Sequence, residues 1–204
     1  MRAEKRRVLV LFAHPALEKS RVNRPLVDAL TDLDEVTIND LYEEYPDFDI
    51  DVEREQALLV GHDMIVFQYP FYWYSTPAII KEWEDLVLEH GWAYGSGGNA
   101  LQGKTLLNAI TTGGLESTYC REGDNRCTMR ELLAPIEQTA NLCGMDFLPP
   151  FVVHGTHQLT DSDISDHADS YRRTIVALRD GNIDLETASQ YVRLNSNLAE
   201  ILGG

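Results

Sequence analysis

The sequence is short of positive charge. Its 204 residues include 17 Lys and Arg against 33 Asp and Glu, which gives a formal net charge of −16 at pH 7. A chain this acidic repels a nucleic-acid backbone and an anionic membrane surface, so we expect neither as a direct partner. Thirteen of the acidic residues lie between Asp28 and Asp63, where Arg54 is the only basic residue. This run predicts a solvated face, with contact to a basic partner as the alternative.

Long hydrophobic runs are also missing. The apolar runs are short and interrupted, well below the roughly 20 residues that a membrane-spanning helix needs. The first apolar stretch, residues 8–13, is too short for the core of a signal peptide, and His14 and Pro15 follow it in place of a cleavage site. We therefore read this stretch as a buried strand and expect a cytoplasmic protein.

Cysteine is scarce. Cys120, Cys127 and Cys143 cannot all pair with one another, and no two of them have the C-x-x-C spacing of a zinc site. His154 and His157 lie close in sequence, but no third ligand is in view. These features predict reduced thiols and no bound metal. A redox switch between Cys120 and Cys127 is the alternative.

The composition and the order of hydrophobic patterns indicate an α/β fold. Apolar residues make up 44% and charged residues 25% of the chain, as in folded globular proteins. Apolar runs alternate with helical patterns, which is typical of a parallel sheet covered on both faces. We expect strands at residues 8–12, 36–41, 64–68, 106–110 and 151–153. We expect helices at residues 21–33, 53–60, 77–88, 130–142 and 165–178.

These elements fit a flavodoxin-like, doubly wound, five-stranded parallel sheet, although their number fits other doubly wound folds equally well. No repeat or low-complexity linker divides the chain. We therefore expect one domain over residues 1–180. Residues 181–204 are expected to form a helical extension of the same domain that begins near Asp184.

In an open parallel sheet, ligands bind beyond the carboxyl ends of the strands. After the first strand, Ser20 and the backbone amides that follow it can form an anion site, although such a serine is more often a plain N-cap. After the third, residues 69–77 contain five aromatic residues and two prolines, which predicts a stiff wall for a planar ring or a packed interface loop. After the fourth, the TTGG turn at residues 111–114 lets a ligand approach the backbone closely. Neither a P-loop nor a G-x-G-x-x-G motif is present, which argues against an NTPase or a Rossmann dehydrogenase.

Five segments carry a resemblance to a known family. They occur in the order HPALEKSRVN, YPFYWYSTPAIIKEW, HGWAYGSGGNALQGK, TTGG and LPPFVVHG. Together they resemble the flavodoxin-like NAD(P)H:quinone oxidoreductase family, and they are most similar to the ancillary subunits of glutathione-regulated potassium efflux systems. The resemblance spans about residues 7–180.

The resemblance implies a tightly but non-covalently bound flavin, FMN or FAD, with NADH or NADPH as the co-substrate. The residues that would bind the phosphate end of the flavin are His14, Ser20, Arg21, Val22 and Asn23. Those that would flank its ring are Phe71, Tyr72, Trp73 and Tyr74, and those that would bind its polar edge are Thr111, Thr112, Gly113 and Gly114. Tyr119 falls at the position of a catalytic tyrosine in the family, whereas Asn125 stands where its histidine partner would be.

The resulting hypothesis is a flavin-dependent NAD(P)H:quinone oxidoreductase that transfers hydride in a two-electron ping-pong cycle. The alternative is a cytosolic regulatory subunit that docks on the inner face of a potassium efflux antiporter and has secondary reductase activity. A one-electron flavodoxin fits less well, because a one-electron carrier does not need an open substrate pocket. The resemblance, together with the aromatic residues Trp83, Trp92 and Tyr94, also implies a homodimer with a quinone as substrate.

Overall fold

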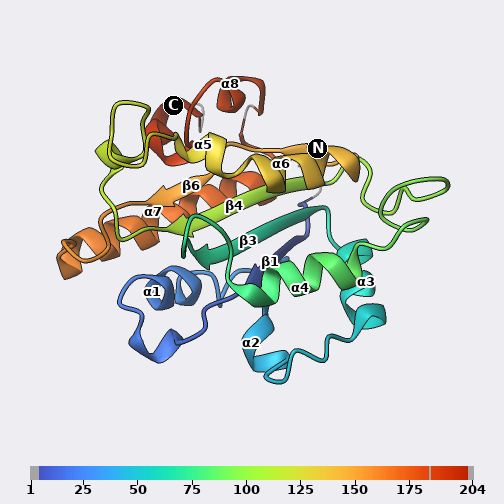
Figure 1. Ribbon diagram of the computed structural model, residues 1–204. Helices are drawn as coiled ribbons and strands as arrows, with labels where there is room; N and C mark the ends of the chain where they lie inside the picture. Colours follow the sequence, from blue (N-terminus) through green and yellow to red (C-terminus); the bar gives the residue numbers. More distant parts are fainter. Residues whose placement is uncertain (1–4, 184, 202–204) are drawn as a thin grey trace.

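Figure 1 shows the computed structural model, which describes residues 5–183 and 185–201. Asp184, where the sequence predicts the start of a C-terminal helix, lies outside these residues, as do the two ends of the chain. One parallel sheet runs through the centre in the order β2-β1-β3-β4-β5, and β6 also pairs with β4. The strands are β1 Val8–Phe12, β2 Val36–Asp40, β3 Met64–Pro70, β4 Thr105–Thr111, β5 Asp146–Phe147 and β6 Phe151–Val153.

Two short strands, β5 and β6, share the edge position of the sheet beside β4. β5 pairs with the start of β4, where Asp146 lies opposite Thr105, and β6 pairs with its end, where Val153 lies opposite Thr111. Pro149 and Pro150 stand between them, and a proline cannot donate a backbone hydrogen bond to a ladder. The sheet therefore has five strand positions in flavodoxin-like order, which confirms the predicted fold class.

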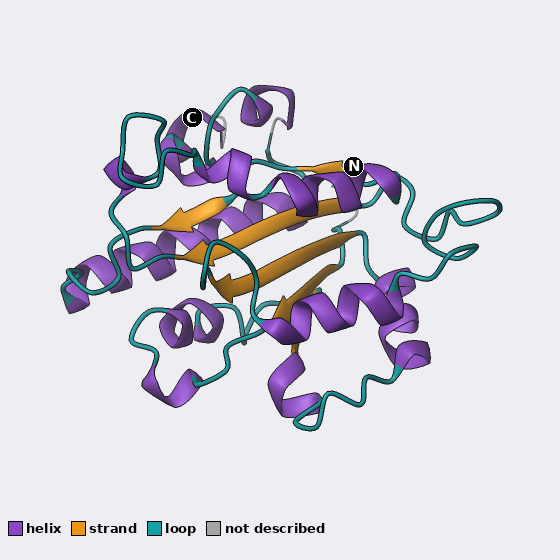
Figure 2. Ribbon diagram, in the orientation of Figure 1, coloured by secondary structure: helices purple, strands orange, loops and turns teal. Residues whose placement is uncertain are grey.

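Helices cover both faces of this sheet. They are α1 Asn23–Asp28, α2 Leu41–Glu44, α3 Val52–Gly61, α4 Ala78–Val87, α5 Met129–Leu132, α6 Ala134–Leu142, α7 Asp161–Arg179, α8 Leu185–Ser189 and α9 Leu198–Ile201. Figure 2 shows α4 and α6 in front of the strands and α7 behind them. Within the described part of the chain, no helix combines the length and the apolar character that crossing a membrane requires.

The core consists of two apolar layers, one on each side of the sheet. Alternate side chains of a strand point to opposite faces, so Leu9 and Leu11 pack with α2 to α6, whereas Val10 and Phe12 pack with α1, α7 and the C-terminal helices. Both layers are buried, which explains why the strands are apolar at nearly every position.

Three predicted helices are shorter or broken in the structure. α1 covers only part of the predicted range 21–33, because after Asp28 the N–H groups of Leu30 and Thr31 donate three residues back instead of four. The predicted helix 130–142 is divided at Leu133, because Pro135 has no N–H to offer the preceding turn. The predicted C-terminal helix is replaced by the short α8 and α9.

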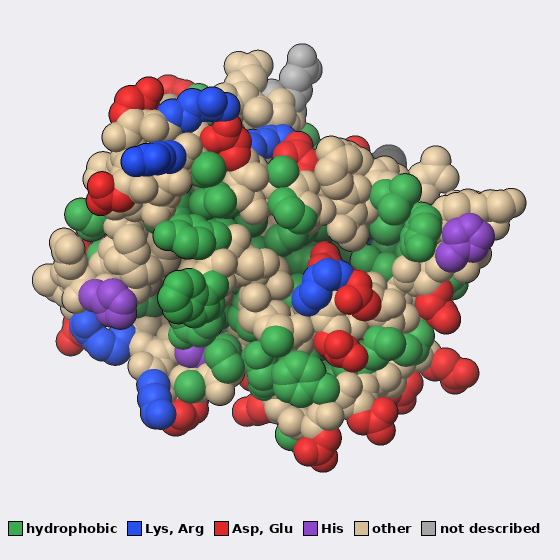
Figure 3. Space-filling view, viewed as in Figure 1, with side chains coloured by type: hydrophobic (Ala, Val, Ile, Leu, Met, Phe, Trp, Pro, Cys, Tyr) green, Lys and Arg blue, Asp and Glu red, His purple; other side chains and the backbone are tan. Residues whose placement is uncertain are grey.

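The acidic run between Asp28 and Asp63 is only partly the solvated face that the sequence predicts. Figure 3 shows acidic side chains along the lower right edge of the molecule, over α2 and α3. Glu55 is different. It belongs to α3, but its side chain is completely buried and accepts a hydrogen bond from Trp83. One carboxylate of this run therefore belongs to the core.

Candidate functional site

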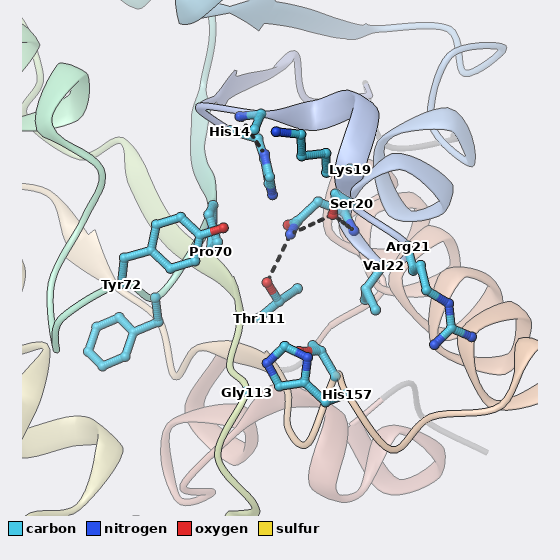
Figure 4. A pocket seen from close by; sticks show the side chains of 14 residues that line it. His14, Lys19, Ser20, Arg21, Val22, Pro70, Tyr72, Thr111, Gly113 and His157 are labelled. Atoms are coloured by element: carbon cyan, nitrogen blue, oxygen red, sulfur yellow. Dashed lines mark hydrogen bonds between the residues drawn. The ribbon is translucent and has the colours of Figure 1, made fainter.

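Two adjoining cavities lie at the carboxyl ends of the strands. The first, of about 370 Å³, is bordered by the segments after β1, β3, β4 and β6 (Figure 4). The second, of about 360 Å³, lies between the aromatic loop after β3 and residues 113–125. Phe71 and Gly113 line both, so the two cavities form one cleft along the edge of the sheet. Each is of the size that small ligands occupy.

Ser20 and Asn23 form the polar floor of the first cavity. The Ser20 hydroxyl oxygen accepts hydrogen bonds from the Asn23 backbone N–H at 3.0 Å and from its side-chain Nδ2 at 3.3 Å. Nδ2 also donates to Thr111 Oγ1 at 2.9 Å, which joins α1 to the end of β4 (Figure 4). Ser20 therefore bonds the first residue of α1 without being its N-cap, which is Val22. In these contacts the Ser20 hydroxyl only accepts. Its hydroxyl hydrogen is left to donate into the cavity.

Several polar groups of this cavity have no hydrogen-bond partner in the part of the chain that the structure describes. Asn23 Oδ1 is buried and accepts no hydrogen bond in residues 5–183 and 185–201. In the same residues, no acceptor is recorded for the backbone N–H groups of Arg21 and Val22. Buried polar groups are normally satisfied, so this floor is suited to a ligand that both accepts and donates hydrogen bonds.

His14 adds a directed donor. It is 6% exposed, and its Nδ1 accepts a hydrogen bond from the backbone N–H of Ala16 at 3.1 Å. Burial lowers the pKa of His14 below its usual value, so the ring is neutral at pH 7. With Nδ1 as an acceptor, the single ring proton is on Nε2. Figure 4 shows this ring pointing into the cavity.

Basic side chains border the same cavity, and the sequence predicted only one of them. Arg21 donates to the Asp161 carboxylate at 2.9 Å, which ties the segment after β1 to the start of α7. Lys19 and His157 also line the cavity. Lys19 carries no sequence signal beyond its place beside Ser20, and His157 had only the spacing of an incomplete zinc site. Asp161 offsets the charge of Arg21, so Lys19 is the cation at this cavity that has no ion pair among the described residues, and it favours an anion.

The aromatic loop after β3 divides its residues between core and cleft. Phe71 is 7% exposed, whereas Trp73 is 94% exposed. Tyr72 lines the first cavity, and Trp73 and Tyr74 line the second. Trp73 and Tyr74 have φ angles of 49° and 63°, which are unfavourable for bulky side chains. Strain of this kind clusters at ligand sites, where about 1–3 kcal/mol per residue is stored.

The TTGG turn contributes Thr111 and its two glycines to the cleft, whereas Thr112 supports the loop from behind. Thr112 is buried, donates its N–H to Val153 and its hydroxyl to Gly114, and lines neither cavity. A Cβ added to Gly113 would lie 2.9 Å from His157 Nε2. The N–H groups of Gly113 and Gly114 have no recorded acceptor among the described residues. A ligand at this turn would meet backbone N–H groups that no side chain of the turn shields.

Tyr119 lies at the far end of the second cavity. Its ring packs between Phe71, at 6.5 Å between centroids, and His154, at 5.3 Å. His154 follows β6, so a histidine does lie beside Tyr119 in the structure. Asn125 stands at the position that the family resemblance assigns to a histidine. Asn125 instead accepts a hydrogen bond from the Tyr74 hydroxyl at 3.2 Å. Burial lowers the pKa of His154 to about 4, with Arg193 adding to the effect, so His154 is neutral at pH 7.

The chain is similar to one protein family and to several curated proteins. Residues 6–175 match a family described as having a flavodoxin-like fold. An uncharacterized NAD(P)H oxidoreductase, YrkL, of Bacillus subtilis (strain 168) is 50% identical over 163 residues, which are 80% of this chain and 94% of that protein. The glutathione-regulated potassium-efflux system ancillary protein KefG of Shigella flexneri is 47% identical over 165 residues, 81% of this chain and 90% of its own length.

Solved structures of similar shape point in the same direction. General stress protein 14 of Treponema denticola, in complex with FMN, is 38% identical with a TM-score of 0.80, and the match covers 84% of this chain and 99% of that one. An NADPH-quinone reductase from P. pentosaceus is 31% identical with a TM-score of 0.76, covering 83% and 97% of the two chains.

Proposed function

This chain belongs to the flavodoxin-like fold family, and from that membership we propose that it is a flavin-dependent NAD(P)H:quinone oxidoreductase. The observation that carries the proposal is a single cleft. It joins the polar floor at Ser20 and Asn23 to an aromatic wall and to the N–H groups of Gly113 and Gly114, which have no acceptor among the described residues. The names of the relatives YrkL and NADPH-quinone reductase support the same reaction class.

The residues of the cleft fit a flavin. Ser20 and the amides of Arg21 and Val22 would hold the phosphate, and the orphaned Asn23 Oδ1 would accept from a hydroxyl of the ribityl chain. Trp73 and its neighbouring aromatic residues would flank the ring. The cofactor is FMN or FAD, and the FMN complex of the Treponema denticola protein favours FMN.

When bound, the flavin would take a hydride from NADH or NADPH and pass two electrons to a quinone in a ping-pong cycle. The chain contributes position and hydrogen bonds. The amides of Gly113 and Gly114, with the Tyr119 hydroxyl, would donate to the ring edge where negative charge develops. The exposure of Trp73 and Tyr74 leaves the second cavity open to a nicotinamide and then to a quinone.

We expect the purified protein to bind one FMN per chain, with yellow absorbance, and to oxidise NADH or NADPH faster when a quinone is added. Ser20→Ala should weaken FMN binding by about 10- to 100-fold, because a hydrogen bond to a charged group is worth about 1.5–3 kcal/mol. Riboflavin, which lacks the phosphate, should bind both forms equally. Titration followed by flavin fluorescence measures both dissociation constants.

The exposed Ser165 on α7 provides the matched control, and Ser165→Ala should bind FMN like the unmodified protein. Absence of flavin absorbance after reconstitution with excess FMN and then FAD would overturn the proposed function. Equal FMN affinity of Ser20→Ala and the unmodified chain would instead show that the phosphate is held elsewhere.

A regulatory role is the second candidate, and the identity with KefG of Shigella flexneri favours it. In that role the protein would bind the cytosolic face of a potassium efflux antiporter and so lie at the inner side of the membrane. Co-purification with such an antiporter from detergent extracts tests it. Reductase activity without co-purification would support the enzyme alone.

We also propose a homodimer, with revised supporting residues. Trp83 is 1% exposed and belongs to the core, so it does not argue for an interface. Trp73, in the aromatic loop, and Leu86, in the last turn of α4, are 94% and 39% exposed. A second copy would cover such apolar surface. Light scattering at micromolar concentration should give twice the 23.0 kDa of one chain. A monomer mass would contradict the proposal.

A further inference from the structure

The C-terminal segment, residues 185–201, lies beyond the part of the chain that matches the family. It packs along the open side of β6. The Asn195 side chain accepts from the Val152 N–H at 3.1 Å and donates to the Val152 carbonyl at 2.8 Å, and the Leu194 N–H donates to Pro150. Asn195 thus satisfies the backbone of an edge strand that would otherwise be unpaired.

The same segment reaches the loop that carries Tyr119. Arg193 donates to the Glu116 carboxylate at 2.6 Å, and their side chains are 17% and 64% exposed. Glu116 opens a helical turn that ends at Thr118, directly before Tyr119. Thr118 and Tyr119 both line the second cavity. Figure 1 shows the red C-terminal segment beside this yellow-green loop.

Each of the two contacts holds a segment that adjoins Tyr119. Arg193 holds the turn that precedes Tyr119. Asn195 holds Val152, two residues before His154, whose ring packs on Tyr119. The polar floor of the first cavity has hydrogen bonds of its own, in which Asn23 is bonded to Ser20 and to Thr111 and neither Arg193 nor Asn195 takes part.

We propose that Arg193 and Asn195 are positioning residues that set the place of Tyr119 and thereby the binding of the electron-accepting substrate in the second cavity. This inference rests on the proposed quinone reductase function. It gives residues 185–201, which lie outside the part of the chain that matches the family, a role in substrate binding rather than in cofactor binding.

The two contacts predict different dependences of KM on salt concentration. A partly exposed ion pair contributes little and is screened by salt. Arg193→Met should therefore raise KM for a water-soluble quinone by about 2- to 5-fold at low ionic strength, and the difference should vanish in concentrated NaCl. Asn195→Ala should raise KM at every salt concentration, because it leaves the Val152 backbone groups unpaired. Neither change should alter the dissociation constant of FMN.

The experiment compares steady-state KM and kcat of the FMN-loaded protein at low and high NaCl. The variants are Arg193→Met, Asn195→Ala, and the exchange Arg193→Glu with Glu116→Arg, which should restore KM if the ion pair acts through its charge. Arg173→Met, an exposed arginine on α7, is the control and should behave like the unmodified protein.

An unchanged KM in Arg193→Met at low salt, or a raised KM that neither salt nor the charge exchange reverses, would overturn the inference and leave the segment as an edge cover. Failure of the unmodified chain to bind FMN or to reduce a quinone would overturn the proposed function itself. The two failures are therefore distinguishable.

Discussion

Replacing Tyr119 with Phe should slow the reduction of bound flavin by NAD(P)H by about 10- to 100-fold. The hydroxyl oxygen of Tyr119 would lie 3.3 Å from a Cβ placed on Gly114, so it faces the same stretch as the free glycine amides. In the described part of the chain, no hydrogen-bond partner is recorded for this hydroxyl. Losing one donor to developing negative charge in a dry site costs about 3 kcal/mol, and the partly exposed position of Tyr119 reduces that figure here.

Stopped-flow absorbance of the flavin gives the rate directly. Phe keeps the ring packed between Phe71 and His154, so the dissociation constant of FMN should stay the same. Cys120→Ser is the neighbouring control, because the Cys120 thiol donates to the Ser117 carbonyl and Cys120 lines neither cavity. It should leave the rate unchanged. Reduction of Tyr119→Phe at the unmodified rate would leave the stabilisation to the glycine amides alone.

The place of the cleft could be predicted from the sequence because parallel strands bring their carboxyl ends to one edge. Ser20, the aromatic loop and the TTGG turn each follow a buried apolar run, and the structure brings all three together. His154 and Lys19 could not be predicted in the same way. Their roles depend on which loops meet in space, and no spacing in the sequence records that His154 packs on Tyr119.

The secondary structure shows a similar division. Every predicted strand is present, because a run of buried apolar residues is a strong local signal. β5 was missed because it has two residues and lies before Pro149 and Pro150. α1 was predicted too long because the backbone changes its hydrogen bonding after Asp28, where the N–H groups of Leu30 and Thr31 donate three residues back instead of four.

Glu55 is the clearest error of sequence interpretation. The acidic run around it predicts a solvated face, but Glu55 and Leu59 are four residues apart on α3 and both point into the core. The carboxylate accepts hydrogen bonds from Asn39, Tyr45, Arg54 and Trp83, at distances from 2.5 to 3.0 Å. Burial and the bond to Glu55 raise the pKa of Tyr45 to about 12, so its hydroxyl remains a donor at physiological pH.

Exchanging Glu55 for Gln should therefore lower the free energy of unfolding by about 3–5 kcal/mol. Glutamine presents an NH₂ group where all of the surrounding groups are donors, and it leaves the Arg54 guanidinium without its buried counter-charge. Such a loss is a large part of the 5–15 kcal/mol by which domains are commonly stable. Urea unfolding followed by circular dichroism measures it.

Glu53→Gln is the matched control, because Glu53 is exposed on the same helix and should change stability by no more than about 0.5 kcal/mol. Through its donors, Glu55 joins β2, α3, α4 and the residue that follows α2. The whole cooperative transition of Glu55→Gln should therefore move to lower urea. Equal midpoints for the two variants would mean that repacking around position 55 satisfies the four donors without a carboxylate.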